Sequence, residues 1–216
     1  MNMKSIFKTV LLLVFGLALI NVNAQTLEES LSTAYKKLDG AAQVSVMMEA
    51  GSQFELAARK WSTAWIANYY AAYSKAIISH QETDAKKKDQ LLDGADQYFA
   101  KVNALKGSSD ETFVLAALLA QARLSVDPRN RWRKYNDLVA ENLEKAKKAN
   151  PDNPRIYYLE GIPVFNKPKL YGGGKDKAKS FFERAKARFA KQDATSVAKP
   201  HWGEKENRAY LQKCNE

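Results

Sequence analysis

The chain has 216 residues, a formal net charge of +10 at pH 7 and a hydrophobic fraction of 45%. Its single cysteine, Cys214, cannot form an internal disulfide, so stability must come from the packing of apolar side chains. The two histidines, His80 and His201, belong to no HExxH motif and have no paired cysteines nearby. This pattern argues against a metal site.

Residues 1–24 have the pattern of a signal peptide that is removed on export. Two lysines precede an apolar run from Val10 to Ile20, and Val22-Asn23-Ala24 places small residues at the spacing of a cleavage site. The run falls short of the roughly 20 apolar residues that a membrane-spanning helix needs. No cysteine stands at the cleavage point, so we expect no lipoprotein. The mature chain, residues 25–216, is predicted to be one domain in the periplasm or outside the cell.

The mature chain predicts an all-α protein of seven or eight helices. It is rich in good helix formers and shows no sustained alternation of apolar and polar residues, so no sheet is expected. Thr26 with Glu29 fits a capping box that opens the first helix. Further helices are predicted over residues 53–79, 85–106, 110–126, 130–149, 154–163 and 175–190. Short turns between them predict antiparallel hairpins.

Local signals mark three of the helix boundaries. Ser108 with Glu111 fits a capping box before the 110–126 helix, whose largely apolar surface predicts a central position. Asn153 and Pro154 supply an N-cap and a first-turn proline for the next helix. The run Gly172–Gly174 is expected to permit a tight bend before the last helix. The alternative is that its backbone amides hold an anion.

The sequence contains no recognisable catalytic machinery. It has no Gly-x-Ser-x-Gly motif, and its carboxylates lie at surface-like spacing with no apolar setting that would raise a pKa. Its lysines recur beside acidic residues, as on a solvated helix face, and export would separate the protein from most nucleic acid. We therefore predict neither an enzyme nor a nucleic-acid-binding protein, and we expect no cofactor.

Three helices share a pattern of a small, a large and a second small or β-branched residue. The three sets are Ala95-Phe99-Val102, Val139-Leu143-Ala146 and Ala178-Phe182-Ala185. A small residue allows two helices to approach closely, and the large residue fills the space beside it. We expect each of these helices to be the second of its hairpin. Tyr157 and Gly161 have a matching spacing on the helix before the third set.

These positions resemble the tetratricopeptide repeat, with Pro151 after its second helix and Tyr157 and Gly161 at the aromatic and glycine positions of its first. The C-terminal half is similar to periplasmic tetratricopeptide-like proteins that include the T-component associated with TRAP transporters. That similarity is carried by Asn153-Pro154-Arg155, Pro168, Tyr171-Gly172-Gly173 and Phe182-Glu183-Arg184-Ala185. A second similarity, to exported tetratricopeptide-like proteins of Bacteroidota, is carried by Phe54 through Trp65, Tyr69-Tyr70, Ala72-Tyr73 and the closing Pro200-His201-Trp202-Gly203. The resemblance implies a superhelix of stacked hairpins.

An aromatic cluster is the candidate site for a binding partner; its members are Trp61, Trp65, Tyr69, Tyr70 and Tyr73. The first three share a helix face, which favours core packing, whereas the last two lie round from it and are expected to be partly exposed. Exposed aromatics on the concave side of stacked hairpins would anchor a protein or peptide.

The predicted function is a non-catalytic protein-interaction scaffold in the cell envelope. The alternative, which the T-component resemblance implies, is a periplasmic binding protein that carries a small apolar ligand in a cleft between helices. A carrier needs an enclosed apolar pocket, whereas a scaffold needs an open concave groove.

Overall fold

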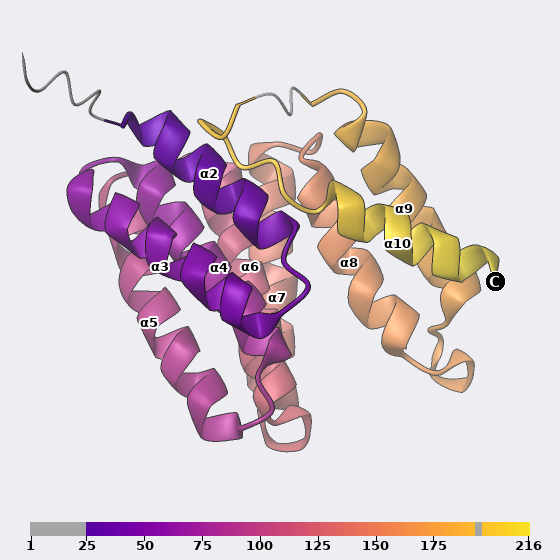
Figure 1. Ribbon diagram of the computed structural model, residues 1–216. Coiled ribbons are helices and arrows are strands. Elements are labelled where there is room, and N and C mark those ends of the chain that lie inside the picture. The colour runs from indigo at the N-terminus through magenta and orange to yellow at the C-terminus, as the bar shows by residue number, and fades with distance from the viewer. Residues whose placement is uncertain (1–24, 193–195) are drawn as a thin grey trace, which may run out of the picture.

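The computed structural model describes residues 25–192 and 196–216, and over these residues the chain forms helices and no strand (Figure 1). The signal peptide predicted at residues 1–24 lies outside the described residues. The α-helices are α2 (Leu27–Asp39), α3 (Val44–Lys60), α4 (Trp65–Gln81), α5 (Ala85–Ala104), α6 (Ser109–Val126), α7 (Pro128–Ala149), α8 (Pro154–Asn166), α9 (Lys175–Phe189) and α10 (Glu204–Asn215). A short 3-10 helix, η1, spans Lys169–Tyr171. The all-α prediction is confirmed, with nine α-helices in the described part of the chain.

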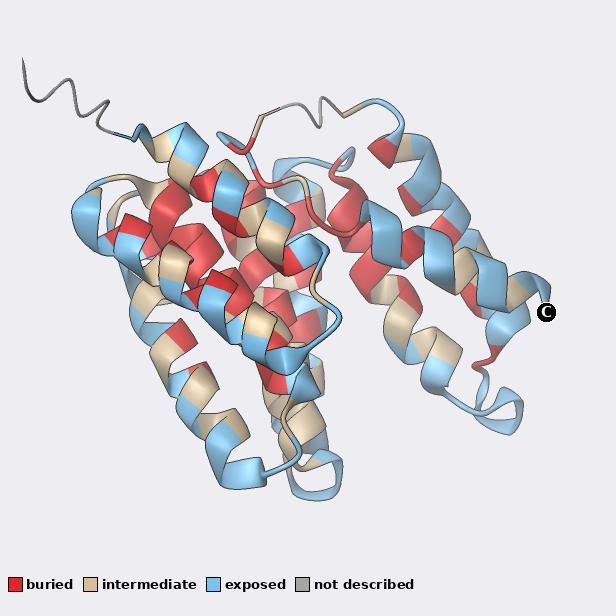
Figure 2. Cartoon of the chain, in the orientation of Figure 1, coloured by how far each residue is buried: buried red, intermediate tan, exposed pale blue. Residues whose placement is uncertain are grey.

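Consecutive helices pack as antiparallel pairs, which confirms the predicted tandem hairpins. The pairs are α2 with α3, α4 with α5, α6 with α7, and α8 with α9, and α10 packs against α9 (Figure 1). The helices α5, α7 and α9, which carry the small–large pattern, are each second in a pair. Buried residues gather around α4, α6 and the first turns of α8, while α10 exposes most of its surface (Figure 2).

The predicted single helix over 53–79 is wrong, because the chain reverses between Lys60 and Trp65 to form the α3–α4 hairpin. The side-chain amide of Asn68 donates hydrogen bonds to the carbonyl oxygens of Ser62 (3.2 Å) and Ala64 (3.0 Å). The Ser62 carbonyl lies in the turn, outside the helical ladder, whereas the Ala64 carbonyl also accepts the first backbone hydrogen bond of α4. The apolar stripe of the sequence continues across the turn because both helices face the same core.

The helix starts follow local capping chemistry in two of the three predicted cases. Thr26 and Glu29 form the predicted capping box, and Asn153 accepts a hydrogen bond from the Arg155 backbone N–H at the start of α8. The predicted box at Ser108 is wrong. The Ser108 hydroxyl donates to the carboxylate of Asp110 (2.5 Å), and Glu111 turns into the protein interior.

The small and large residues of the repeat pattern lie at the contacts within and between hairpins. Gly161 of α8 faces Phe182 of α9 so closely that a Cβ atom at Gly161 would lie 2.5 Å from the Phe182 ring. The other buried members are Ala95, Val102, Val139, Leu143, Ala146, Tyr157, Ala178 and Ala185. Phe99 differs because it is only half-buried and lines a surface groove between α5, α6 and α7.

A buried polar network joins α4, α6, α8 and the C-terminal segment. The Arg155 side chain is 1% exposed and forms an ion pair with Glu111, donating from both Nη2 and Nε. Glu111 also accepts hydrogen bonds from Asn153 (2.8 Å) and from the Tyr69 hydroxyl (3.2 Å). Burial opposes the Arg155 charge, but the adjacent Glu111 carboxylate outweighs it, so the pKa of Arg155 lies above its ordinary value. The Nη1 group of the same guanidinium donates to the Trp202 carbonyl (3.3 Å), which ties the segment before α10 to this network.

Removing the carboxylate of this pair should destabilise the fold strongly. Glu111→Ala leaves a buried, unpaired guanidinium, so we expect the free energy of unfolding to fall by about 3–5 kcal/mol in urea denaturation. The matched control is Glu141→Ala, which breaks the exposed Lys145–Glu141 pair on α7 and should cost less than about 1 kcal/mol. Equal losses in the two variants would show that the buried pair does not hold the helices together.

Adding a methyl group at Gly161 should also destabilise the protein. We expect Gly161→Ala to cost about 1–3 kcal/mol, because the new Cβ overlaps the Phe182 ring in a packed interface. A second change, Phe182→Leu, should recover part of that loss by removing the overlapping atoms. Gly94→Ala is the control, since its Cβ would meet only the flexible Lys75 side chain. A loss from Gly161→Ala no larger than that from Gly94→Ala would contradict close α8–α9 packing.

Candidate functional site

A cleft of about 520 Å³ opens between the N-terminal hairpins and the C-terminal helices. We call it the central cleft. Residues from α2, α3, α4, α6, α8 and α10, and from the segment just before α10, line it. Its apolar wall consists of Leu38, Met47, Ile77 and Leu118, and its aromatic wall of Tyr35, Tyr73, Tyr158, Trp202 and Tyr210. The cleft therefore depends on segments that are far apart in the sequence.

The aromatic wall is held in place by ring contacts and by the buried polar network. The rings of Tyr73 and Trp202 stack with centroids 5.0 Å apart, and Tyr158 meets Trp202 edge-on at 6.4 Å. The Trp202 indole N–H donates to the Tyr69 hydroxyl (2.9 Å), which in turn donates to Glu111. A chain of polar contacts thus runs from the Arg155–Glu111 pair to the cleft wall. Such support fixes ring positions before any ligand arrives.

Charged groups lie at the edge of the cleft on α2, α4 and α10. Lys205 donates from Nζ to the backbone carbonyl and carboxylate of Asp39. Burial, reinforced by the nearby Asp39 charge, raises the pKa of Glu206. His80 is exposed at the opening of the central cleft, and protein atoms on the cleft side reduce its contact with water. Desolvation, with Lys88 adding to it, lowers the pKa of this imidazole. Burial raises the pKa of Tyr73 well above its ordinary value, so the phenol stays neutral.

The structure places the predicted aromatic cluster differently from the sequence expectation. Tyr69 and Tyr70 are fully buried and Tyr73 is 6% exposed, so the expected partial exposure of Tyr70 and Tyr73 is wrong. The cause is the segment before α10, which crosses α4, where the Tyr70 hydroxyl donates to the Lys199 carbonyl (3.2 Å). Trp61 and Trp65 are half-buried near the α3–α4 turn. Tyr73 is the member of the set that lines the central cleft.

Most of the cleft residues could not be found from a local pattern. Tyr35 and Tyr158 belong to ordinary amphipathic helices, and Trp202 lies in a segment with no regular period. Tyr210 and Glu206 lie on α10, which the sequence analysis did not predict because its surface is mostly polar and Asn207 alone is buried among its described residues. The spatial neighbours of these residues come from other hairpins.

The Gly172–Gly174 run forms a bend whose amides are already used. The N–H groups of Gly172, Gly173 and Gly174 donate to the carbonyl oxygens of Lys169, Pro168 and Val164, respectively. Gly172 and Gly174 have φ angles of 83° and 103°, which favour glycine. These internal bonds explain the glycines without an anion.

Metal and membrane signals are also absent from the part of the chain that the structure describes. Over residues 25–192 and 196–216, no group of three or more His, Cys, Asp or Glu side chains is placed to hold a metal ion. None of the helices in those residues is long and apolar enough to cross a membrane.

The described residues form an all-α fold of tandem hairpins around an aromatic cleft. No model of a known protein family matches the chain, and a comparison with curated proteins gave no match. Among solved structures, the chain is similar to the HusA haemophore from Porphyromonas gingivalis, with a TM-score of 0.73 and 32% sequence identity. The match covers 86% of this chain and 91% of that one. This chain belongs to the family of that haemophore.

The match supports part of the resemblance proposed from the sequence. An exported helical protein of the Bacteroidota type is supported, because the neighbour is a haemophore from that group. The likeness to the tetratricopeptide repeat and to the T-component has no independent support in this match and stays a prediction. The neighbour is a binding protein, which agrees with a non-enzymatic role.

Protonation of Glu206 should contribute to stability at mildly acidic pH. Its pKa in the folded protein lies above the ordinary 4.5, so the folded state binds this proton more tightly than the unfolded state does. The resulting stabilisation is complete below the unfolded pKa and is lost as pH rises through the folded pKa. Wild-type stability relative to Glu206→Gln should therefore fall as the pH rises above about 4.5, as measured by urea denaturation.

Glu204→Gln is the control for this measurement, since Glu204 lies on the same helix turn and does not line the cleft. A pH dependence that Glu206→Gln leaves unchanged would show that Glu206 is not the titrating group.

Proposed function

We propose that this protein is an exported, non-catalytic carrier that holds a tetrapyrrole such as haem in the central cleft. The observation that carries the proposal is a ring-lined cleft of about 520 Å³ in a chain that belongs to a haemophore's family. Small-molecule sites are typically concave, mostly apolar and of this order of volume, with a few polar groups that set orientation. The carrier alternative from the sequence is therefore better supported than the protein-interaction scaffold.

The side chains of the cleft suit a flat, apolar molecule. Aromatic faces and edges from Tyr35, Tyr73 and Trp202 offer large contact areas at a low cost in conformational entropy, because these rings are already packed. Neutral phenols and the largely apolar floor at Leu118 favour the ring system of a macrocycle over a sugar or a peptide backbone.

The edge of the cleft suits the acidic groups that tetrapyrroles carry. Lys205 supplies an ammonium group near the opening, where it contacts Asp39. A ligand carboxylate could take the place of Asp39 at this exposed lysine at little cost, because an exposed ion pair contributes little stability. Residues that could approach a metal at the centre of the ligand are His80 and Met47, which both line the cleft. Imidazole and thioether are both known haem ligands.

The predicted export of the chain agrees with the proposed carrier role. A carrier that collects a tetrapyrrole must meet it outside the cytoplasm, and the signal-peptide pattern at residues 1–24 supports this location. We propose that residues 25–216 act as a single binding domain in the periplasm or outside the cell.

A charge placed in the apolar wall should weaken binding. We expect Ile77→Arg to weaken the affinity for ferric protoporphyrin IX by about tenfold or more, because ligand entry would bury an unpaired guanidinium. Binding is measured by the change in porphyrin absorption and by quenching of tryptophan fluorescence.

Leu170→Arg is the matched control because Leu170 is 87% exposed on the loop between α8 and α9, away from the cleft. Its affinity should equal that of the wild type. Absence of porphyrin binding in the wild-type protein, or an equal loss in the two variants, would refute the proposed function.

A further inference from the structure

The connection between α8 and α9 carries the most exposed large apolar side chains of the described residues. Leu170 is 87% exposed and Tyr171 is 68% exposed, whereas the other large apolar side chains in the described part of the chain reach at most 59%. Both belong to η1, at the lower right of the molecule in Figure 1, on a mostly exposed loop (Figure 2). We call residues 167–179 the α8–α9 tip. Single exposed apolar residues are common on protein surfaces, but an adjacent pair at the end of a hairpin points to a contact.

Backbone hydrogen bonds within the loop hold this pair outside the protein. The N–H groups of Gly172 and Gly173 donate to the carbonyl oxygens of Lys169 (2.9 Å) and Pro168 (3.2 Å) and so close the turn. The turn is tight, because a Cβ atom at Gly173 would overlap the Lys167 carbonyl. The apolar pair is therefore presented to solvent by a closed turn and is not covered by the helices behind it.

An excess of positive charge surrounds the apolar pair. The α8–α9 tip contains five lysines and a single acidic residue, Asp176. Asp176 pairs with Lys169 (2.7 Å), and in the described part of the chain no carboxylate lies within ion-pair distance of Lys167, Lys175 or Lys177. The last two lie in the first turn of α9, where the helix dipole favours acidic over basic side chains. The local structure therefore does not explain these lysines.

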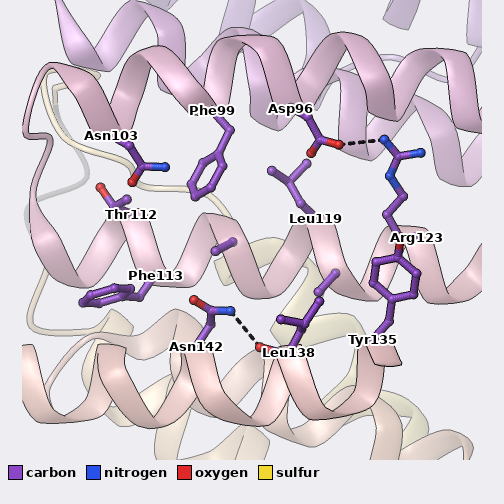
Figure 3. A pocket seen from close by; sticks show the side chains of 12 residues that line it. Asp96, Phe99, Asn103, Thr112, Phe113, Leu119, Arg123, Tyr135, Leu138 and Asn142 are labelled. Carbon is purple, nitrogen blue, oxygen red and sulfur yellow. Dashed lines mark hydrogen bonds and ion pairs between the residues drawn. The ribbon is translucent and has the colours of Figure 1, made fainter. Parts of the chain in front are cut away.

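A second charged region of the surface differs, because its charges are neutralised within the fold. Arg123 on α6 donates to the carboxylates of Asp89 (3.0 Å), Asp93 (2.6 Å) and Asp96 (2.7 Å) on α5, and the last of these pairs is drawn in Figure 3. Those charges hold two helices together. The unpaired lysines of the α8–α9 tip hold no helices together and lie beside exposed apolar side chains, a combination that is typical of segments that bind a membrane surface.

We propose that the α8–α9 tip docks reversibly on an anionic lipid surface. Leu170 enters the headgroup layer together with Tyr171, whose amphipathic ring is of the kind enriched at membrane–water interfaces. The lysines stay at the surface and attract acidic headgroups. Lysine is a compact charge on a flexible stem and needs no fixed partner geometry, whereas recognition of one phosphate or carboxylate group commonly uses the arginine fork. The α8–α9 tip contains no arginine, which favours a lipid surface over a structured acidic partner.

The test is co-sedimentation of residues 25–216, which contain every described helix, with vesicles of phosphatidylcholine that include about one third phosphatidylglycerol. We expect saturable binding that weakens at high salt, and little binding to vesicles of phosphatidylcholine alone. Leu170→Ser combined with Tyr171→Ser should weaken binding by about tenfold, because less apolar surface leaves water. Combining Lys167→Gln, Lys175→Gln and Lys177→Gln should weaken it by about tenfold or more.

Each of these variants has a control that makes the same chemical change elsewhere. Met48→Ser combined with Leu56→Ser removes two exposed apolar side chains from α3. The charge control changes three exposed lysines at the C-terminal ends of α5, α7 and α9 to glutamine, namely Lys101, Lys148 and Lys191. Both controls should leave vesicle affinity unchanged, because charges farther than a Debye length from the lipid are largely screened.

Tyr171→Trp tests insertion without removing the apolar pair. The indole keeps an interfacial aromatic side chain at this position and adds a fluorophore. Its emission should be quenched when the phosphatidylcholine of the anionic vesicles carries bromine on its acyl chains. The wild-type protein, which has no tryptophan in the α8–α9 tip, should show little quenching under the same conditions.

The proposal is wrong if the wild-type protein does not bind the anionic vesicles, binds neutral vesicles equally well, or loses as much affinity in a control as in its matched variant. Binding that depends on the lysines but not on the apolar pair, with no quenching in Tyr171→Trp, would show a surface for a soluble polyanion instead. These outcomes leave the tetrapyrrole proposal standing, because it depends on the porphyrin titration alone. Variants of the α8–α9 tip should retain wild-type affinity for ferric protoporphyrin IX, and Ile77→Arg should retain vesicle binding.

Discussion

The buried Arg155–Glu111 ion pair is the interaction on which the placement of the C-terminal helices depends. An isolated charge in a protein interior is costly, so each member of the pair requires the other and the hydrogen bonds around it. Those partners come from α4, α8 and the segment before α10, and they are brought together only when all three elements pack against α6. Sequential hairpin packing alone would leave the direction of α8 and α10 less constrained.

The central cleft is a consequence of that arrangement. One wall is formed by α2 and α4, and the other by α8 and α10. The Trp202–Tyr69 hydrogen bond connects these walls to the ion-pair network. Trp202 belongs to both features, since its carbonyl accepts from Arg155 and its indole stacks on Tyr73. The rings are therefore positioned by polar contacts that a ligand does not touch. A preorganised apolar slot of this kind loses little entropy when a rigid, flat ligand enters.

The fold was largely predictable from the sequence, and the site was not, for one physical reason. The apolar periodicity of a helix is visible in its own sequence. The small residues at hairpin contacts, such as Ala95 and Ala178, pack against neighbours in the same repeat. The reversal after Lys60, the inward turn of Glu111 and the polar helix α10 depend on residues in other hairpins. The expected partial exposure of Tyr70 and Tyr73 was wrong for the same reason. The segment that covers them, around Lys199, is about 130 residues away in the sequence.

Mapping of the bound porphyrin by nuclear magnetic resonance tests the central claim most directly. A diamagnetic probe, zinc protoporphyrin IX, is titrated into isotopically labelled protein, and the shifts of backbone amides and of the tryptophan indoles are followed. The structure predicts that the largest changes fall on the Trp202 indole and on residues of α2, α4, α8 and α10 that line the central cleft. Changes confined to α5 and α7, or to exposed lysines spread over the surface, would contradict a tetrapyrrole site in the cleft.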